Sequence, residues 1–138
     1  MPRYDLYHNQ VKQALIKEGW QITDDPFTLD YKGIRLYADL GAERIFAAQK
    51  DLEKILVEIK VFNSPSLMIE LEKAIGQYNV YRSFLKRLEP QRRLYLAIPD
   101  DVYQDFFSLE PIQEVISDQL VFLIVFNPEL EVINQWIK

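Results

Sequence analysis

The 138-residue sequence predicts one α/β domain, spanning residues 1–138, with a mixed central sheet flanked by helices. The apolar run at 54–62 is typical of a strand, and the run at 120–127 is typical of a strand covered on both faces. A long stretch of helical periodicity separates the first of these strands from another at 92–99. Because a helix that joins two strands of one sheet is typical of a parallel crossover, the 54–62 strand is expected to be central.

The first predicted element is a helix from Asp5 to about Glu18, in which Val11 and Leu15 fall on one face. His8, the only histidine of the chain, is aligned with these apolar residues and is expected to face the core or a cleft. One interpretation is a structural histidine held by a hydrogen bond, for which Asp5 is a candidate partner. The other is an accessory residue of a functional cleft.

A β-hairpin is expected next, because Lys32-Gly33 is a two-residue turn signal between the strand-like segments 27–31 and 34–40. The GAER segment that follows, residues 41–44, is predicted to be a loop. Its charged residues are expected either in a solvated turn or at the rim of a cleft.

The long helix is predicted to begin at Ser64-Pro65, where serine is a good N-cap and proline is favoured at the first helical position. It is expected to end near Leu88. A strand is expected next at 92–99, followed by helical segments that begin at Asp100 and Glu110. The 120–127 strand and a final strand from Glu131 complete the chain.

Composition narrows the possible functions. The chain has no cysteine, which excludes disulfides and thiolate metal sites and is compatible with a cytoplasmic location. The N-terminus is polar and no apolar run is long enough to span a bilayer, so neither a secretory signal nor a membrane partner is expected. A single histidine cannot form a His-rich zinc site, and four scattered glycines form no phosphate-binding loop.

The formal net charge of −5 argues against a simple nucleic-acid coat, which usually carries a basic surplus. The positive charge is nevertheless concentrated, because five basic residues lie within twelve positions: Arg82, Lys86, Arg87, Arg92 and Arg93. A solvated helix end is one interpretation of this basic cluster. A surface that contacts DNA is the other, with Arg82, Lys86 and Arg87 as the contacting residues.

Glu58 and Lys60 are charged residues within an apolar strand, where alternation places them on one face. Antiparallel pairing with the preceding strand is expected to bring Asp39 beside Glu58. Two carboxylates and an ammonium can hold Mg²⁺ or Mn²⁺ and assist hydrolysis of a phosphodiester. The alternative is a buried structural ion pair between Lys60 and one of the carboxylates.

Asp39, eighteen intervening residues and then Glu58-Ile59-Lys60 resemble the PD-(D/E)xK nuclease motif. Ala38 departs from the motif, which has proline at that place. The resemblance implies a restriction-endonuclease-like core in which Asp39, Glu58 and the backbone carbonyl of Ile59 bind the metal. It also implies that Lys60 orients the attacking water.

Gln77 and Tyr81, four residues apart and therefore on one helix face, resemble the Q-x-x-x-Y element of RecB-like members of that superfamily. The resemblance makes them accessory candidates that touch the catalytic carboxylates or the nucleic acid. The superfamily often has an acidic residue on the first helix, where this chain has His8.

A closer resemblance is carried by segments spread along the whole chain: YHNQVKQALIKEGW, ITDDP, ADLGAER, VEIK, IGQYNVYR and INQWIK. These segments are similar to the XisH family, cyanobacterial proteins named as controlling factors for excision of the fdxN element. The resemblance implies a part in DNA rearrangement and a companion protein of the XisI type.

Two functions are therefore predicted from the sequence. The first is a magnesium- or manganese-dependent DNA endonuclease with Asp39, Glu58 and Lys60 as catalytic residues, for which a homodimer would supply the two sites of a double-strand cut. The second is a catalytically silent DNA-binding or regulatory module that acts in complex with an XisI-like protein.

Overall fold

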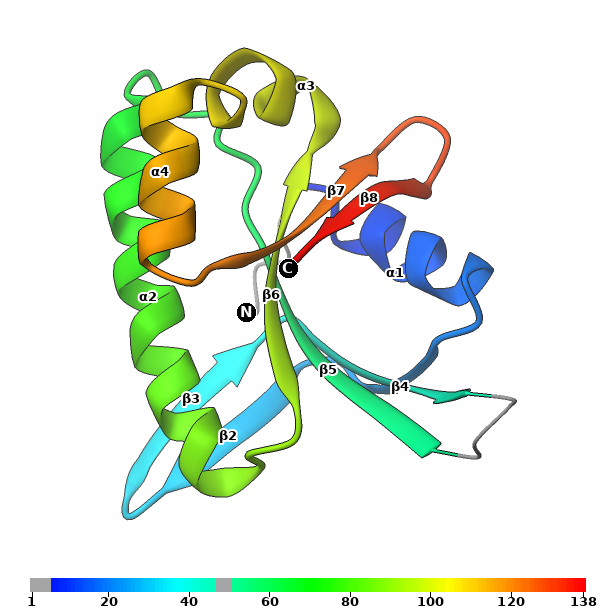
Figure 1. Cartoon of the computed structure of the whole chain (residues 1–138). Coiled ribbons are helices and arrows are strands. Elements are labelled where there is room, and N and C mark those ends of the chain that lie inside the picture. Colours follow the sequence, from blue (N-terminus) through cyan, green and yellow to red (C-terminus); the bar gives the residue numbers. More distant parts are fainter. Residues whose placement is uncertain (1–5, 47–50) are drawn as a thin grey trace.

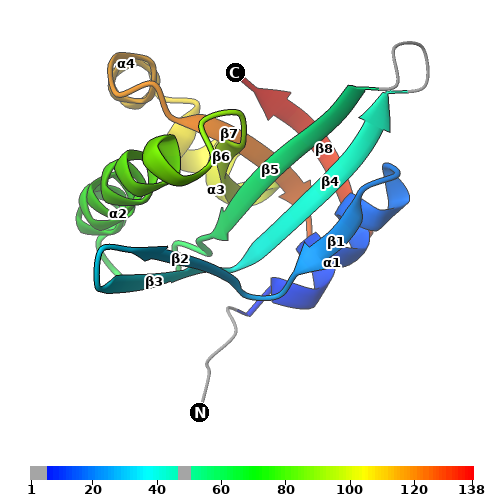
Figure 2. The ribbon, with the colours of Figure 1, turned by 90° about the horizontal axis from the view of Figure 1, so that it is seen from below.

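The computed structural model describes residues 6–46 and 51–138. Its elements, in chain order, are α1 (His8–Lys17), β1 (Gln21–Asp24), β2 (Phe27–Tyr31), β3 (Ile34–Ala38), β4 (Leu40–Phe46), β5 (Asp51–Ile59), α2 (Leu67–Leu88), β6 (Arg93–Pro99), α3 (Asp100–Val102), the π-helix η1 (Tyr103–Phe107), α4 (Glu110–Asp118), β7 (Phe122–Asn127) and β8 (Val132–Ile137). Helices α2 and α4 lie on one side of the central sheet and α1 lies on the other (Figures 1 and 2). The predicted mixed sheet flanked by helices is confirmed.

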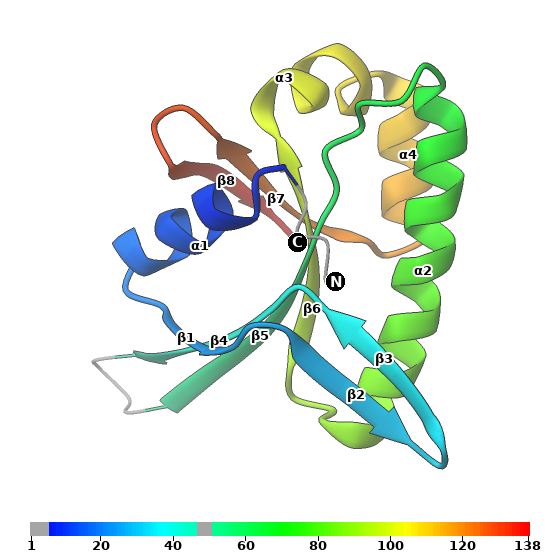
Figure 3. The same ribbon diagram turned by 180° about the vertical axis from the view of Figure 1, so that it is seen from behind.

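The central sheet has the strand order β1-β4-β5-β6-β7-β8. Neighbouring strands are antiparallel except at β5–β6 and β6–β7, which are parallel. Strands β2 and β3 form a separate antiparallel hairpin, which lies beside the C-terminal half of α2 (Figure 3). The predicted parallel crossover through α2 and the central position of β5 are therefore both confirmed.

Strand β5 divides the core into two layers. Ile55, Val57 and Ile59 are fully buried and pack in the layer that contains α1, whereas Leu56 packs in the layer that contains α2. Because side chains alternate along a strand, Glu58 lies on the α2 side, where its residue is only 5% exposed. The charge of Glu58 is thus placed beneath a helix rather than on an open edge.

The predicted loop at 41–44 is wrong. These residues lie within β4, which pairs with β1 on one side and β5 on the other. Gly41 serves a close approach, because a Cβ atom there would lie 2.7 Å from Cδ2 of Phe27. Arg44 lies over the Trp20 ring and forms a 3.2 Å ion pair with Glu53 of β5. Its charge is therefore paired across two strands rather than exposed in a turn.

Several predicted boundaries also differ. The first helix begins at His8, and the expected start at Asp5 lies outside the described residues. The long helix begins at Leu67, because Ser66, and not Ser64, is the N-cap whose side chain accepts from the Ile69 N–H at 3.3 Å. Strand β1 was not predicted, since its four residues include none that is fully buried. The helix expected from Asp100 is a three-residue turn followed by η1.

A buried tyrosine joins three of these elements. Tyr78 of α2 is 2% exposed; its hydroxyl donates to the Leu94 carbonyl of β6 at 2.7 Å and accepts from the Phe122 N–H of β7 at 3.1 Å. Burial raises the pKa of Tyr78, although the bond from Phe122 and the charge of Arg82 oppose this effect. The hydroxyl is therefore a neutral bridge at physiological pH.

We expect Tyr78→Phe to lower the free energy of unfolding by about 1–3 kcal/mol, because both backbone groups lose their buried partner. Urea denaturation measures this loss. Tyr103→Phe is the control, since the Tyr103 hydroxyl makes no hydrogen bond within the described part of the chain. Equal stability of the two variants would contradict a bridging role for Tyr78.

No helix in the described ranges, 6–46 and 51–138, is long and apolar enough to cross a membrane.

Candidate functional site

Asp39 occupies the corner between the two sheets. Strand β3 ends at Ala38 in the hairpin and β4 begins at Leu40 in the central sheet, so Asp39 is the single residue between them. Leu40 pairs with Val57, which places Asp39 opposite Glu58. The two acidic residues therefore lie opposite each other where the chain leaves one sheet for the other.

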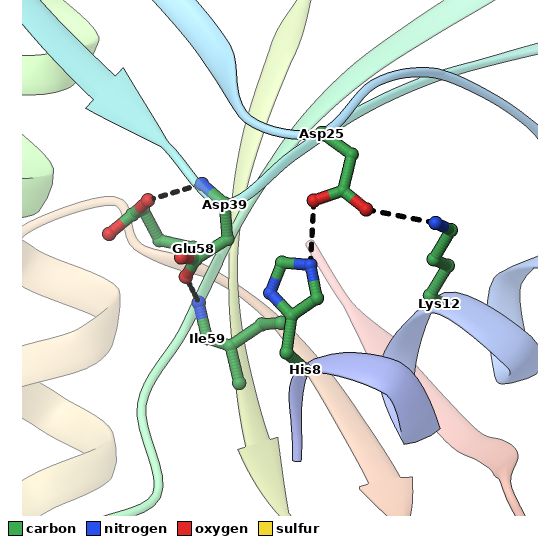
Figure 4. A network of polar contacts seen from close by, with 6 residues as sticks. All are labelled: His8, Lys12, Asp25, Asp39, Glu58 and Ile59. Carbon is green, nitrogen blue, oxygen red and sulfur yellow. Dashed lines mark hydrogen bonds and ion pairs between the residues drawn. The ribbon is translucent and has the colours of Figure 1, made fainter. Parts of the chain in front are cut away.

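Reciprocal hydrogen bonds join this corner to β5. The Asp39 N–H donates to Oε1 of Glu58 at 2.8 Å, and the Ile59 N–H donates to Oδ2 of Asp39 at 2.7 Å (Figure 4). These side-chain bonds thus extend the hydrogen-bond ladder between β4 and β5 to the point where the chain turns into the β2–β3 hairpin. Each carboxylate satisfies a backbone donor that would otherwise lack a partner.

Helix α2 contributes two further residues to the site. Nε2 of Gln77 donates to Oε2 of Glu58 at 2.9 Å, so both oxygens of this carboxylate are hydrogen-bonded. The Tyr81 hydroxyl, one helical turn later, donates to the carbonyl of Tyr37 at 2.9 Å. Gln77 and Tyr81, which the sequence pairs by their spacing, therefore lie together beside the corner.

The electrostatic setting of Tyr81 connects it to the carboxylates. Burial raises the pKa of Tyr81, a hydrogen bond with Gln77 lowers it, and the negative charges of Glu58 and Asp39 raise it further. The net effect is a raised pKa, so the phenol keeps its proton at physiological pH. It is therefore a hydrogen-bond donor next to two acids.

Lys60 directly follows β5, and its backbone N–H donates to the Ala97 carbonyl of β6 at 3.0 Å. The side chain is half-buried and, by alternation, lies on the same face as Glu58. Among the ion pairs of residues 6–46 and 51–138, none joins Lys60 to Asp39 or Glu58. The predicted structural ion pair is therefore absent from the described structure.

His8 belongs to an ion-pair group at the start of α1. Its residue is 7% exposed, and Nε2 donates to Oδ1 of Asp25 at 2.7 Å, while Nζ of Lys12 donates to Oδ2 at 2.9 Å (Figure 4). A buried, hydrogen-bonded histidine was one of the two interpretations of the sequence. The partner is Asp25 of the β1–β2 connection, whereas the proposed partner Asp5 lies outside the described residues.

The pKa of Asp25 indicates how this group responds to acid. Burial raises it, but the hydrogen bonds and charges of Lys12 and His8 together hold it below the ordinary value of 3.8. A lowered pKa in the folded state contributes stability that is present above about pH 3.8. This contribution is lost as the pH falls through the folded-state pKa.

We therefore expect Asp25→Asn to lower the free energy of unfolding by about 1–2 kcal/mol at pH 7, a value reduced for the partial exposure of Lys12. The stabilities of the variant and the parent should converge below pH 3.8. Urea denaturation from pH 7 to pH 3 measures both curves. A constant difference over the whole range would show that Asp25 stabilises the fold without its charge.

The structure separates the three basic residues predicted to contact DNA. Arg82 donates to the Leu120 carbonyl at 2.7 Å, on the side of α2 that faces β6 and β7. Lys86 is exposed on the same side. Arg87 lines a different hollow with the hairpin residues Tyr31 and Lys32. The basic cluster of the sequence is therefore not one continuous surface in the structure.

Sequence reasoning missed one contact of this region. It expected Gln77 to touch either a carboxylate or the nucleic acid, and the bond to Glu58 agrees with the first of these, but it did not consider Asp25 as a partner for His8. The Asp25-Pro26 dipeptide signals a turn but does not reveal that this turn passes over the start of α1. In the described residues, no group of three or more acidic, histidine or cysteine side chains is gathered to hold a metal ion.

Fold and site together define a mixed α/β protein with two carboxylates at a corner of its central sheet. The sequence model of the XisH protein family matches residues 1–134. No curated protein matches the chain.

Two solved structures are similar to the whole chain. One is an XisH family protein from Nostoc punctiforme, 42% identical, with a TM-score of 0.87 and coverage of 97% of this chain and 100% of that one. The other is an fdxN element excision controlling factor protein from Anabaena variabilis, 43% identical, with a TM-score of 0.87 and coverage of 98% and 100%. The chain belongs to the XisH family.

Proposed function

We propose that this member of the XisH family is a metal-dependent DNA endonuclease with a restriction-endonuclease-like core, and that Asp39, Glu58 and Lys60 form its active site. The observation that carries the proposal is the position of Asp39 opposite Glu58 at the corner, where each carboxylate accepts from a backbone N–H of the other segment, with Lys60 on the face of Glu58. The Anabaena relative, described as an excision controlling factor, supports a role on DNA.

The donor atoms at the corner fit a hard divalent cation. Mg²⁺ is commonly held by one or two carboxylates and several waters, and Mn²⁺ accepts the same oxygen donors. Asp39, Glu58 and the carbonyl of Ile59 would supply such oxygens. When bound, the cation would lower the pKa of a coordinated water and polarise a phosphate oxygen.

The other residues of the site have separate tasks in this proposal. The Lys60 ammonium, not committed to an ion pair in the described structure, orients the attacking water and stabilises the charge that develops on the phosphate. Gln77 holds the Glu58 carboxylate through Oε2, and the neutral Tyr81 phenol fixes the adjacent end of the hairpin through Tyr37. They are positioning residues rather than catalytic ones.

Calorimetric titration of Mn²⁺ into the purified protein tests the proposal, followed by cleavage of plasmid and branched DNA. We expect saturable binding with about one site per chain and metal-dependent cutting. Gel filtration of the same sample determines whether the active species is a homodimer, which would supply the two sites needed for a double-strand cut.

A regulatory module is the second candidate, and a specific observation favours it. Both oxygens of Glu58 already accept hydrogen bonds from the protein, so the carboxylate has a structural task without a metal. In this case the nuclease-like core is a scaffold, and the protein acts on DNA in complex with an XisI-like partner. Absence of Mn²⁺ binding, together with DNA affinity only in the complex, would select this candidate.

A further inference from the structure

Phe62 has an unusual backbone conformation just beyond the Asp39–Glu58 corner. In the described parts of the chain, four residues other than glycine have a positive φ: Lys32, Phe62, Leu120 and Glu131. All of these except Phe62 lie in turns, where a left-handed residue is expected. Phe62 has a φ of 53° and is only 5% exposed. Because the left-handed region is unfavourable for a bulky side chain, its surroundings must hold it there.

The side chain of Phe62 is held by an aromatic contact. Its ring lies edge-to-face against that of Phe107, with 5.1 Å between the ring centroids and 87° between the planes. Phe107 is 1% exposed and packs in the same core layer as Phe62. Edge-to-face pairs add to the stabilisation that burial alone provides. The ring of Phe62 therefore cannot turn away without opening the core.

The partner ring belongs to a second uncommon backbone feature. Phe107 is the last residue of η1, in which the Ser108 N–H donates to the Tyr103 carbonyl at 2.8 Å, the i→i+5 bond of a π-helix. Single π turns are rare and are frequent at functional sites. Two unfavourable backbone features thus meet in one ring contact. This meeting indicates that the two segments have a task beyond burial of the rings.

The two segments leave neighbouring parallel strands at the same end of the sheet. Ile59, the last residue of β5, pairs with Ala97 of β6. Phe62 follows the end of β5, and η1 follows the end of β6 after the short α3. Figure 3 shows the chain from β5 passing near α3 before α2 begins. The Phe62–Phe107 contact therefore joins the exits of two strands at their carboxyl ends, where α/β proteins commonly place their sites.

Lys60 lies between two fixed points of the chain. Its backbone N–H donates to the Ala97 carbonyl at 3.0 Å, so the sheet holds the chain at this residue. Among the backbone–backbone hydrogen bonds of the described residues, none involves residues 61–65. The buried ring of Phe62 anchors this segment instead, and only Val61 lies between it and Lys60. The direction in which Lys60 leaves β5 is therefore set by Ala97 on one side and by Phe62 on the other.

We propose that Phe62 is a positioning residue for Lys60. The contact with Phe107 holds the left-handed backbone of Phe62, and this backbone holds the Lys60 side chain on the face of Glu58. The inference rests on the proposed function only for the task of Lys60. It also gives η1, which the proposed active site does not use, a part in supporting that site.

Two substitutions of Phe62 separate positioning from packing. Phe62→Gly removes the ring but accepts a positive φ without steric cost. Phe62→Leu keeps more buried apolar surface, yet it retains the steric cost of the left-handed region and loses the edge-to-face contact. A packing role alone predicts that glycine is more harmful than leucine in every measurement. The positioning role predicts that glycine is more harmful to stability, whereas leucine is more harmful to Lys60.

Amide hydrogen exchange of the full chain, measured at Lys60, tests the proposal. We expect this amide to exchange at least about tenfold faster than in the parent in Phe62→Leu and in Phe107→Leu, but at most about threefold faster in Phe62→Gly. Phe84→Leu is the matched control, because Phe84 forms an edge-to-face pair with Tyr31 at 6.0 Å, in the C-terminal half of α2. It should alter exchange at Lys60 less than about twofold. Urea denaturation ranks the stabilities of the four variants.

Single-turnover cleavage at saturating Mn²⁺ adds a second measurement. We expect Phe62→Leu to cut about tenfold more slowly than the parent, because misplacement of a catalytic group by about 1 Å can cost up to about 10²-fold in rate. Mn²⁺ affinity should stay within about twofold of the parent, since Asp39 and Glu58 are unchanged. Phe62→Gly should keep most of the parental rate despite its lower stability.

Three outcomes of the exchange measurement would overturn the proposal. These are faster exchange at Lys60 in Phe62→Gly than in Phe62→Leu, an unchanged rate in Phe107→Leu, or an equal increase in Phe84→Leu. If Phe62→Gly does not fold, the comparison of Phe107→Leu with Phe84→Leu decides. Because hydrogen exchange requires neither metal nor DNA, its result holds even if the parent chain does not cut DNA. A failure of the positioning role is thus distinguishable from a failure of the proposed active site.

Discussion

Replacing Glu58 by glutamine is expected to abolish Mn²⁺ binding and, with it, DNA cleavage. Changes outside the ligand shell weaken metal affinity about 10–100-fold, so removal of a charged ligand should exceed that loss. Cleavage should fall with it, because the site would no longer hold the cation that would lower the pKa of the attacking water. Calorimetry and plasmid cleavage, performed on the same preparation, measure the two effects.

The contacts of Glu58 make this substitution informative. Glutamine keeps an amide oxygen that can accept from the Asp39 N–H, as Oε1 of Glu58 does at 2.8 Å. Its new amino group faces Gln77, whose own amide can rotate to present an oxygen in place of the present 2.9 Å donor. The corner therefore keeps its hydrogen bonds while losing one negative charge.

Glu53→Gln is the matched control, because it removes one carboxylate from the same strand at the ion pair with Arg44. It should bind Mn²⁺ like the parent chain. Binding of parental strength in Glu58→Gln would rule out Glu58 as a ligand and would favour the regulatory module.

The site was more predictable than the strands that carry it. Alternation within the apolar run 54–62 correctly placed Glu58 and Leu56 on one face of β5. Asp39 was expected at the end of a strand that pairs with β5. In the structure it follows β3, which pairs with β2, and it precedes β4, which is the strand that pairs with β5. The two carboxylates meet in either arrangement, because the chain reverses direction between them.

The missing features depend on tertiary contacts that no local pattern contains. The segment 41–44 of β4 contains glycine and charged residues and therefore resembles a turn. In the structure, Gly41 allows the close approach of Phe27, and Arg44 packs on Trp20 and pairs with Glu53. The basic residues of α2 are neighbours in sequence but diverge around the helix. Arg82 and Lys86 thus face β6 and β7, while Arg87 faces the hairpin.

The second large effect is expected from Lys60→Met, which should leave Mn²⁺ affinity within a few-fold of the parent while slowing cleavage about 10²–10³-fold. Loss of one group that stabilises developing charge has this magnitude in other enzymes. Affinity should be retained because no ion pair joins Lys60 to either carboxylate in the described structure. Single-turnover cleavage at saturating Mn²⁺ separates the chemical step from binding.

Lys54→Met provides the comparison, since Lys54 lies on the same strand and contacts Glu43 at 3.9 Å, away from the corner. Its cleavage rate should match that of the parent. If Lys60→Met instead lost metal affinity and cleavage in equal proportion, Lys60 would act by positioning the carboxylates rather than the water. Paired measurements on Glu58→Gln and Lys60→Met therefore assign the two roles independently, because one variant removes a ligand and the other leaves the ligand set intact.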